Sequence, residues 1–215
     1  MKPRTLTPRV LQAAERHLAS VDPVMARIIA EVGRCRLGRS RREDPFTALV
    51  EAVVWQQLST RAASTIYGRV LALAGDSGLT PAALLACSDE QLRGAGLSRS
   101  KISFLRDLAT RATDGSLTFD ALADLEDDEV VATLTQIKGI GRWTAEMFLM
   151  FRLLRPDVLP VGDLGIVKAM QRHYRIRKTT PDRLYRLAEP WRPYRSVASW
   201  YLWASTDVVP GNGKP

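Results

Sequence analysis

The chain of 215 residues contains little cysteine and little histidine, with two of each. Cys35 and Cys87 lie far apart, so they form no Cys-x-x-Cys pair and are too few to hold an iron–sulfur cluster. Two cysteines give no disulfide framework, which indicates a reducing compartment. His17 and His173 show no zinc-binding spacing, and no Ser/His/Asp motif is present. We therefore expect no metal site built from side chains.

Long apolar runs are also missing. No stretch approaches the length of a membrane span, and no apolar segment of a signal peptide follows Lys2, Arg4 and Arg9. We expect a soluble intracellular protein, cytoplasmic and, in a bacterium, associated with the nucleoid. Hydrophobic residues make up 46% and charged residues 25%, which is ordinary globular composition. The length is enough for one unit or for two small lobes.

Acidic residues are outnumbered, at 23 against 31 Lys and Arg, so the formal net charge is +8. The sequence pI is about 9.9. Basic side chains displace counterions from phosphate backbones, so this charge favours a polyanionic partner. Basic proteins without such a partner are common, and the charge alone therefore decides little.

Alternating β patterns are scarce; the nearest candidate, residues 158–161, is interrupted by Pro160. Helix starts are frequent, because a capping residue repeatedly precedes a proline suited to the first helical position. These pairs are Thr7-Pro8, Asp22-Pro23, Asp44-Pro45, Thr80-Pro81 and Thr180-Pro181. Ser88 and Gln91 add a capping box. We predict an all-α fold of about ten helices.

Helical spacing of apolar residues supports this fold. Three predicted faces consist of Phe46, Leu49, Val50, Val53 and Val54; of Trp143, Met147, Met150, Phe151 and Leu154; and of Val197, Trp200, Tyr201 and Ala204.

The most specific motif is the segment 134–146, in which Gly139 and Gly141 flank Ile140 between two predicted helices. Glycines allow a tight turn and a close backbone approach, and the amides of the new helix would face a phosphate there. Lys138 and Arg142 flank the turn, and Ile140 would pin it to the core. The segment resembles the helix-hairpin-helix motif, with Ala145 as its small residue. A plain turn between helices is the alternative.

Asp163 follows Gly141 by 22 residues, within Pro160-Val-Gly-Asp-Leu-Gly-Ile166, and is expected to open a helix. Most aspartates at such positions only cap. Hairpin, helix, Pro/Gly-containing loop and aspartate in this order resemble the helix-hairpin-helix (HhH-GPD) DNA glycosylase superfamily. The resemblance implies a two-lobed helical fold with the active-site cleft between the lobes, formed by residues 1–215 as one glycosylase unit, with the hairpin at about 130–154. It also implies that Asp163 is the catalytic carboxylate, which stabilises positive charge on the sugar.

Within that superfamily the chain is most similar to the 3-methyladenine DNA glycosylase II branch, in a short form without an N-terminal β lobe. Bifunctional relatives carry a lysine two residues after the second hairpin glycine, where this chain has Trp143, so base excision without strand cleavage is expected. The segments 55–59 (Trp-Gln-Gln-Leu-Ser) and 191–203 also resemble that branch. The absent cysteines exclude the cluster-bearing branch.

The resemblance further implies roles for individual residues. Aromatic faces attract electron-poor alkylated purines, so the base pocket is assigned to Trp143, Trp200, Met147, Gln56 and Gln57. Tryptophan at helical spacing is usually core, and Trp203 is interpreted in that way. DNA contacts are assigned to Lys138, Gly139, Ile140, Gly141, Arg142, Lys101 and Lys168, with Arg172 beside them. The residue that fills the space of the flipped base is assigned to Arg99, with Leu97 and Ser98 as alternatives.

The resulting expectation is a monomeric, monofunctional DNA glycosylase. It would flip alkylated purines of the 3-methyladenine and 7-methylguanine type out of double-stranded DNA and hydrolyse the N-glycosidic bond, without a cofactor other than a monovalent cation at the hairpin carbonyls. Two alternatives stay open: a non-catalytic helix-hairpin-helix DNA-binding protein, and a glycosylase for oxidised bases, mismatches or another lesion. The retained carboxylate argues against the first.

Overall fold

The computed structural model describes residues 5–38, 44–75 and 78–206. Within these ranges the protein is helical and contains no β-strand, which confirms the predicted all-α fold. Residues 158–160 are irregular, as Pro160 predicts. No helix in the described part of the chain is both long enough and apolar enough to cross a membrane.

The predicted helix starts are confirmed at the atomic level. Side-chain oxygens of the five capping residues each accept a backbone N–H of the following turn, and each helix begins at the next proline; the capping residues are Thr7, Asp22, Asp44, Thr80 and Thr180. Ser88 and Gln91 form the reciprocal capping box at another helix start. Each cap satisfies an amide that would otherwise lack a partner at the helix end.

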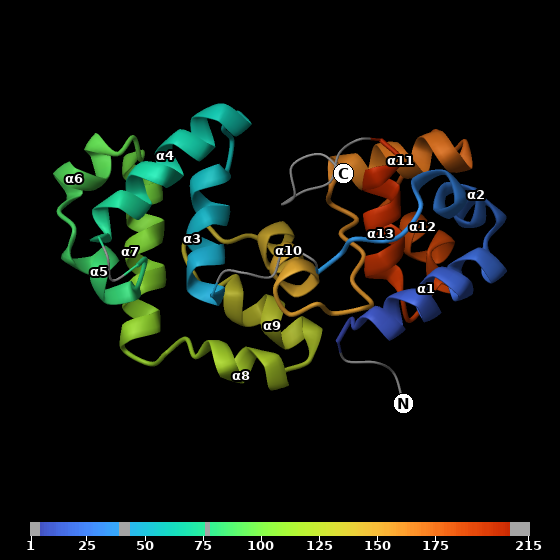
Figure 1. Ribbon diagram of the computed structural model, residues 1–215, viewed down its shortest axis with the longest axis horizontal. Coiled ribbons are helices and arrows are strands. Elements are labelled where there is room, and N and C mark those ends of the chain that lie inside the picture. Colours follow the sequence, from blue (N-terminus) through green and yellow to red (C-terminus); the bar gives the residue numbers. More distant parts are fainter. Residues whose placement is uncertain (1–4, 39–43, 76–77, 207–215) are drawn as a thin grey trace. The chain divides into compact units, whose positions relative to one another are not determined.

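The chain divides into two compact units. Unit 1 comprises Met1–Arg41 and Leu149–Pro215, and unit 2 comprises Arg42–Phe148. The helices of unit 1 are α1 (Pro8–Val21), α2 (Pro23–Val32), α11 (Leu164–Tyr174), α12 (Pro181–Leu187), the 3-10 helix η2 (Glu189–Trp191) and α13 (Arg195–Ala204) (Figure 1). The predicted cleft between two lobes stays a prediction.

In unit 1, α13 is the central element, since all ten of its residues are buried. It packs against α1, α2 and α11. Asp22 links three helices of this unit. Its Oδ2 accepts hydrogen bonds from the Tyr174 hydroxyl of α11 at 2.7 Å and from the Trp191 indole of η2 at 2.8 Å, while its Oδ1 caps α2.

Unit 2 contains α3 (Pro45–Trp55), α4 (Thr60–Leu73), α5 (Pro81–Ala86), α6 (Asp89–Gly94), α7 (Arg99–Thr113), α8 (Phe119–Asp124) and α9 (Asp127–Leu134). It also holds most of α10 (Arg142–Phe151), which continues into unit 1. The predicted apolar face of α3 is buried, and α7 packs against α3, α5 and α6. Trp143, predicted for the apolar face of α10, is instead 42% exposed.

Candidate functional site

The hairpin lies between α9 and α10, as its motif predicts. Gly139 has a φ of 78°, and a Cβ atom at this position would lie 2.1–2.5 Å from ring atoms of Phe104 on α7. No side chain fits there, so the turn requires glycine. Ile140 is 4% exposed and fixes the turn to the core of unit 2, as expected.

Two charged residues on α7 anchor the backbone of the hairpin, and sequence patterns did not reveal this contact. Oδ2 of Asp107 accepts the Lys138 backbone amide at 2.9 Å and the Arg111 Nε at 3.1 Å, and Arg111 also donates to the Gln136 carbonyl at 3.2 Å. Burial opposes ionisation of Asp107, but these donors and the charge of Arg111 together hold its pKa below the ordinary aspartate value. The hairpin backbone is therefore anchored by a carboxylate that stays charged.

The segment 55–59, which begins at the last residue of α3, contacts the same hairpin. Nε2 of Gln56 donates to the Gly139 carbonyl at 2.9 Å. Gln56 was predicted to line the base pocket, and in the structure its amide instead donates to the backbone of the hairpin. Gln57 is exposed with a φ of 57°, beside Leu58, which is 38% exposed.

Lys101 also differs from its predicted role as a phosphate contact. Its Nζ donates to the carbonyls of Val54 at 2.6 Å and Gln56 at 2.8 Å, which lie at the end of α3. Burial lowers the pKa of this ammonium group. The physical reason for the correction is that carbonyls at a helix C-terminus lack partners and attract a cation.

The remaining predicted DNA contacts of unit 2 lie on its surface. Lys138, Gly141 and Arg142 are exposed, and Arg142 forms an ion pair with Glu146 at 3.2 Å. Met147 is half-buried. At the start of α7, Leu97 is buried, whereas Ser98 and Arg99 are both exposed and the Ser98 hydroxyl caps the helix. Arg99 is therefore the exposed candidate whose side chain is not used as a cap, and its role in filling the space of the flipped base stays a prediction.

In unit 1 the candidate catalytic carboxylate opens α11, as predicted. The Ile166 amide and the Trp203 indole N–H both donate to Oδ1 of Asp163, each at 2.9 Å. The side chain is 9% exposed. Two N–H donors on one oxygen stabilise negative charge and fix the direction of the carboxylate.

The sequence assigned Trp200 to the site and Trp203 to the core. Trp203 lies in the core, as predicted, and is in addition the aromatic partner of Asp163. Trp203 is fully buried, stacks on Phe151 with ring centroids 6.0 Å apart, and bonds the carboxylate. Trp200 is 2% exposed and packs edge-to-face on Tyr201. This burial corrects the assignment, because it leaves Trp200 almost no surface to offer a base.

Gly165 makes the contact between Asp163 and Trp203 possible. A Cβ atom on Gly165 would lie 3.0 Å from Oδ1 of Asp163 and 3.1 Å from Cδ1 of Trp203. These distances are shorter than ordinary van der Waals contacts, so a larger residue would push the indole away from the carboxylate.

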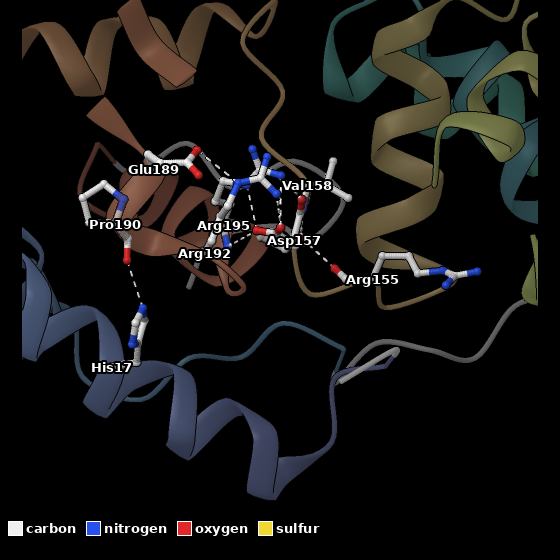
Figure 2. Close-up of polar contacts among 9 residues, drawn as sticks. His17, Arg155, Asp157, Val158, Glu189, Pro190, Arg192 and Arg195 are labelled. Atoms are coloured by element: carbon white, nitrogen blue, oxygen red, sulfur yellow. Dashed lines mark hydrogen bonds and ion pairs between the residues drawn. The ribbon is translucent and has the colours of Figure 1, made fainter. Parts of the chain in front are cut away.

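The loop that leads to Asp163 is clamped by the start of α13 (Figure 2). Arg195 donates to Asp157 Oδ1 at 2.7 Å and to the Asp157 carbonyl at 2.9 Å, and Arg192 donates to Asp157 Oδ2 at 2.9 Å. The Ser196 hydroxyl donates to the Arg155 carbonyl at 2.6 Å and accepts the Val158 amide at 2.9 Å. The segment 191–203 therefore positions the loop that leads to Asp163 through its first residues, and Asp163 itself through Trp203 at its end.

Comparison with known proteins agrees with this arrangement. Residues 50–193 match the model of the HhH-GPD superfamily of base excision DNA repair proteins. The chain belongs to this superfamily. A DNA-3-methyladenine glycosylase of Schizosaccharomyces pombe is 36% identical over 204 residues, which cover 93% of this chain and 89% of that protein.

Solved structures of HhH-GPD relatives share the fold. The S. pombe 3-methyladenine DNA glycosylase in complex with abasic DNA has a TM-score of 0.80 at 36% identity and covers 90% of this chain and 97% of that one. A DNA-3-methyladenine glycosidase from Bacillus halodurans has a TM-score of 0.80 at 39% identity, covering 94% and 91% respectively.

The HhH-GPD site residues predicted from the sequence thus fall into two groups. Unit 2 brings the predicted residue Gln56 to the hairpin, and in unit 1 the predicted Asp163 contacts Trp203, which was predicted as a core residue. Lys168 is exposed on α11. Sequence reasoning missed Asp107 and Arg195; for Arg195 the signal was its place in the family-like segment 191–203.

Proposed function

We propose that this protein is a monofunctional DNA glycosylase that removes alkylated purines of the 3-methyladenine and 7-methylguanine type. The observation that carries the proposal is the buried Asp163 carboxylate, fixed by two N–H donors, in a chain with the DNA-binding hairpin but with Trp143 in place of the lysine nucleophile. The names of the relatives support the alkylated-base specificity.

Asp163 is assigned two roles: its negative charge stabilises the sugar cation, and its carboxylate accepts a proton from the attacking water. As the bond between C1′ and the purine nitrogen breaks, its electron pair leaves with the base and positive charge develops on the sugar. A carboxylate held near C1′ stabilises that charge. A water oxygen then bonds to C1′ and releases a proton, which Asp163 accepts and passes to solvent. The products are the free base and an abasic site.

The alkylated substrate itself favours this mechanism. N-alkylation can leave a purine cationic, so the base departs as a neutral leaving group and needs less protonation by the enzyme. The exposed Trp143 ring offers an aromatic face to such an electron-poor base, because aromatic faces attract cations. Without an amine nucleophile no Schiff base forms, so borohydride should trap no covalent adduct with DNA.

The decisive experiment compares base release from methylated duplex DNA by the wild type and Asp163→Asn. Asparagine caps helices as well as aspartate does, so α11 should persist while the charge is lost. We expect DNA affinity to be kept and base release to fall by at least about 100-fold, the scale for loss of one preorganised electrostatic group.

Asp22→Asn is the matched control. Asp22 is also 9% exposed, caps a helix and accepts an indole N–H, but it is assigned no chemistry. It should lower stability while the rate of base release by folded protein stays near that of the wild type. Base release by Asp163→Asn at the wild-type rate would overturn the assignment of Asp163, and DNA binding by wild type without base release would favour the non-catalytic alternative or another lesion.

The proposal includes a monomer that acts on double-stranded DNA in the cytoplasm or nucleoid. It also includes a monovalent cation at the hairpin, for which backbone carbonyls are a suitable donor set. The carbonyls of Ile137 and Gly139 each accept one hydrogen bond and have a second lone pair. DNA affinity in potassium chloride should exceed that in choline chloride at equal ionic strength.

A further inference from the structure

The positive charge of the chain is divided unequally between the two units. Unit 1 contains 21 Lys and Arg against 8 Asp and Glu, a formal charge of +13, whereas unit 2 contains 10 against 15, a charge of −5. The hairpin belongs to unit 2, so the unit that carries the DNA-binding motif is net acidic. Affinity for a phosphate backbone scales with the number of basic contacts. Most of the charge that could supply it therefore lies in unit 1.

Helix α11 concentrates part of this charge along one line. Leu164, Lys168, Arg172 and Arg175 are all exposed and follow each other at intervals of four, four and three residues, which places them on one face of the helix. Leu164, at 65% exposure, is the first residue after Asp163. At 1.5 Å per residue the line extends about 16 Å from its start next to the carboxylate.

Further basic residues follow in the loop after α11 and in α12, which comes next along the chain (Figure 1). Arg177, Lys178, Arg183 and Arg186 are exposed, and Asp182 is the single acidic residue between positions 168 and 186. Two side chains fix the loop backbone: Gln171 donates to the Arg177 carbonyl at 3.4 Å, and Arg183 donates to the Lys178 carbonyl at 3.3 Å. We refer to these exposed basic residues together as the basic face; they are Lys168, Arg172, Arg175, Arg177, Lys178, Arg183 and Arg186.

The backbone conformation of Arg175 distinguishes the basic face from a surface whose charges are merely solvated. Arg175 ends α11 with φ 52° and ψ 37°, the left-handed conformation that glycine normally occupies at this position. An arginine there is strained, and such strain concentrates at functional positions. Favourable interaction with the helix dipole explains cations in the last turn only. It applies to Arg172 on α11 and Arg186 on α12 but leaves Arg177, Lys178 and Arg183 unexplained. No carboxylate in the described ranges forms an ion pair with any residue of the basic face.

We propose that the basic face binds the phosphate backbone of the duplex that flanks the lesion, as a second DNA-binding surface in addition to the hairpin. The inference rests on the proposed function in one respect: Asp163 must reach the damaged nucleotide, so a surface that begins one residue later begins beside DNA. Successive cations on α11 rise by about 6 Å, while duplex DNA presents a phosphate about every 3.4 Å of axis on each strand. The face can therefore follow one strand away from the lesion.

The test is the salt dependence of binding to an undamaged fluorescent duplex, measured by anisotropy. The variant is Arg177→Gln with Lys178→Gln, in the loop of the basic face. The control is Arg9→Gln with Arg16→Gln, two exposed arginines on α1 of the same unit. Both variants lose the same net charge from exposed positions, so a general effect of charge is equal in the two and only a local contact separates them.

Each phosphate contact contributes about 0.9 to the slope of log affinity against log salt. We therefore expect the loop variant to bind more weakly at low salt, with a slope smaller by up to about 2. Between 50 and 200 mM salt, wild type would then lose about 12-fold more affinity than the loop variant. Equal slopes in the loop variant and wild type, or an equal change in the control, would overturn the proposal.

Measuring base release at saturating enzyme distinguishes failure of this binding proposal from failure of the proposed function. Because the basic face lies outside the chemistry, the loop variant should release methylated bases at the wild-type single-turnover rate. Binding to undamaged DNA requires no chemistry, so failure of wild type to release any base would contradict the proposed function without altering the binding comparison.

Discussion

Replacement of Trp203 by Phe tests how strongly Asp163 depends on its indole partner. The substitution keeps an aromatic ring next to Phe151 and removes the N–H that donates to Oδ1 at 2.9 Å. A hydrogen bond to a charged group contributes about 1.5–3 kcal/mol. If that whole amount is expressed in the rate, base release slows by about 10- to 150-fold, since 1.36 kcal/mol corresponds to tenfold. The bond also exists in the ground state, which makes this an upper bound.

Trp200→Phe is the control, because the two indoles differ in one respect. Trp200 is on the same helix and equally buried, but its Nε1 has no hydrogen-bond partner among the described residues. Both substitutions reduce ring size in the core and should lower stability by similar amounts. The assay is single-turnover base release from methylated duplex at saturating enzyme, with folding checked by circular dichroism. Equal rates in the two variants would refute a specific role for Trp203.

Two further predictions concern the hairpin and pH. Gly139→Ala should lower stability by about 2–4 kcal/mol, since the left-handed backbone and the clash with Phe104 add, and should weaken duplex binding. Gly141→Ala has open space around it within the protein and should leave stability unchanged. Equal urea midpoints for the two variants would contradict this reasoning. Burial and the charges of Arg172 and Arg27, opposed by Glu31, lower the pKa of His173. The unfolded chain then binds more protons than the folded one, so the free energy of unfolding rises with pH up to about 6.5. In urea unfolding, His173→Gln should therefore reduce the dependence of stability on pH between pH 5 and 7. An unchanged pH dependence in this variant would show that His173 is not its source.

The fold and the hairpin were predictable because their signals are local. A capping oxygen followed by proline determines where a helix begins, and the side chains of Thr80 and Thr180 cap as expected. The hairpin glycines have a steric requirement that is visible in the pattern, and Gly139 meets it against Phe104. The contacts of Asp107 were not predictable in this way, because an aspartate in the middle of a helix gives no sign that a turn 31 residues later will donate to it.

The choice between Trp200 and Trp203 shows a different limit. An amphipathic helix reveals its buried face through a 3.6-residue period. Helix α13 is buried on every side, so the apolar face predicted from its sequence does not mark one buried side and cannot indicate which tryptophan points toward Asp163. Only the packing of α13 against α11 makes that choice, with Gly165 providing the space for the indole.

Local geometry also does not distinguish a structural aspartate from the aspartate that we propose to be catalytic. Asp22 and Asp163 are both 9% exposed, both cap a helix and both accept an indole N–H. Their difference lies in what surrounds them. Asp22 Oδ2 is held by Tyr174 and Trp191 and ties helices together, whereas Asp163 follows a loop clamped by Arg195 and begins the exposed line of α11. A carboxylate needed for chemistry must be fixed in direction and lie next to a surface that substrate can reach, and of these two residues Asp163 meets both conditions.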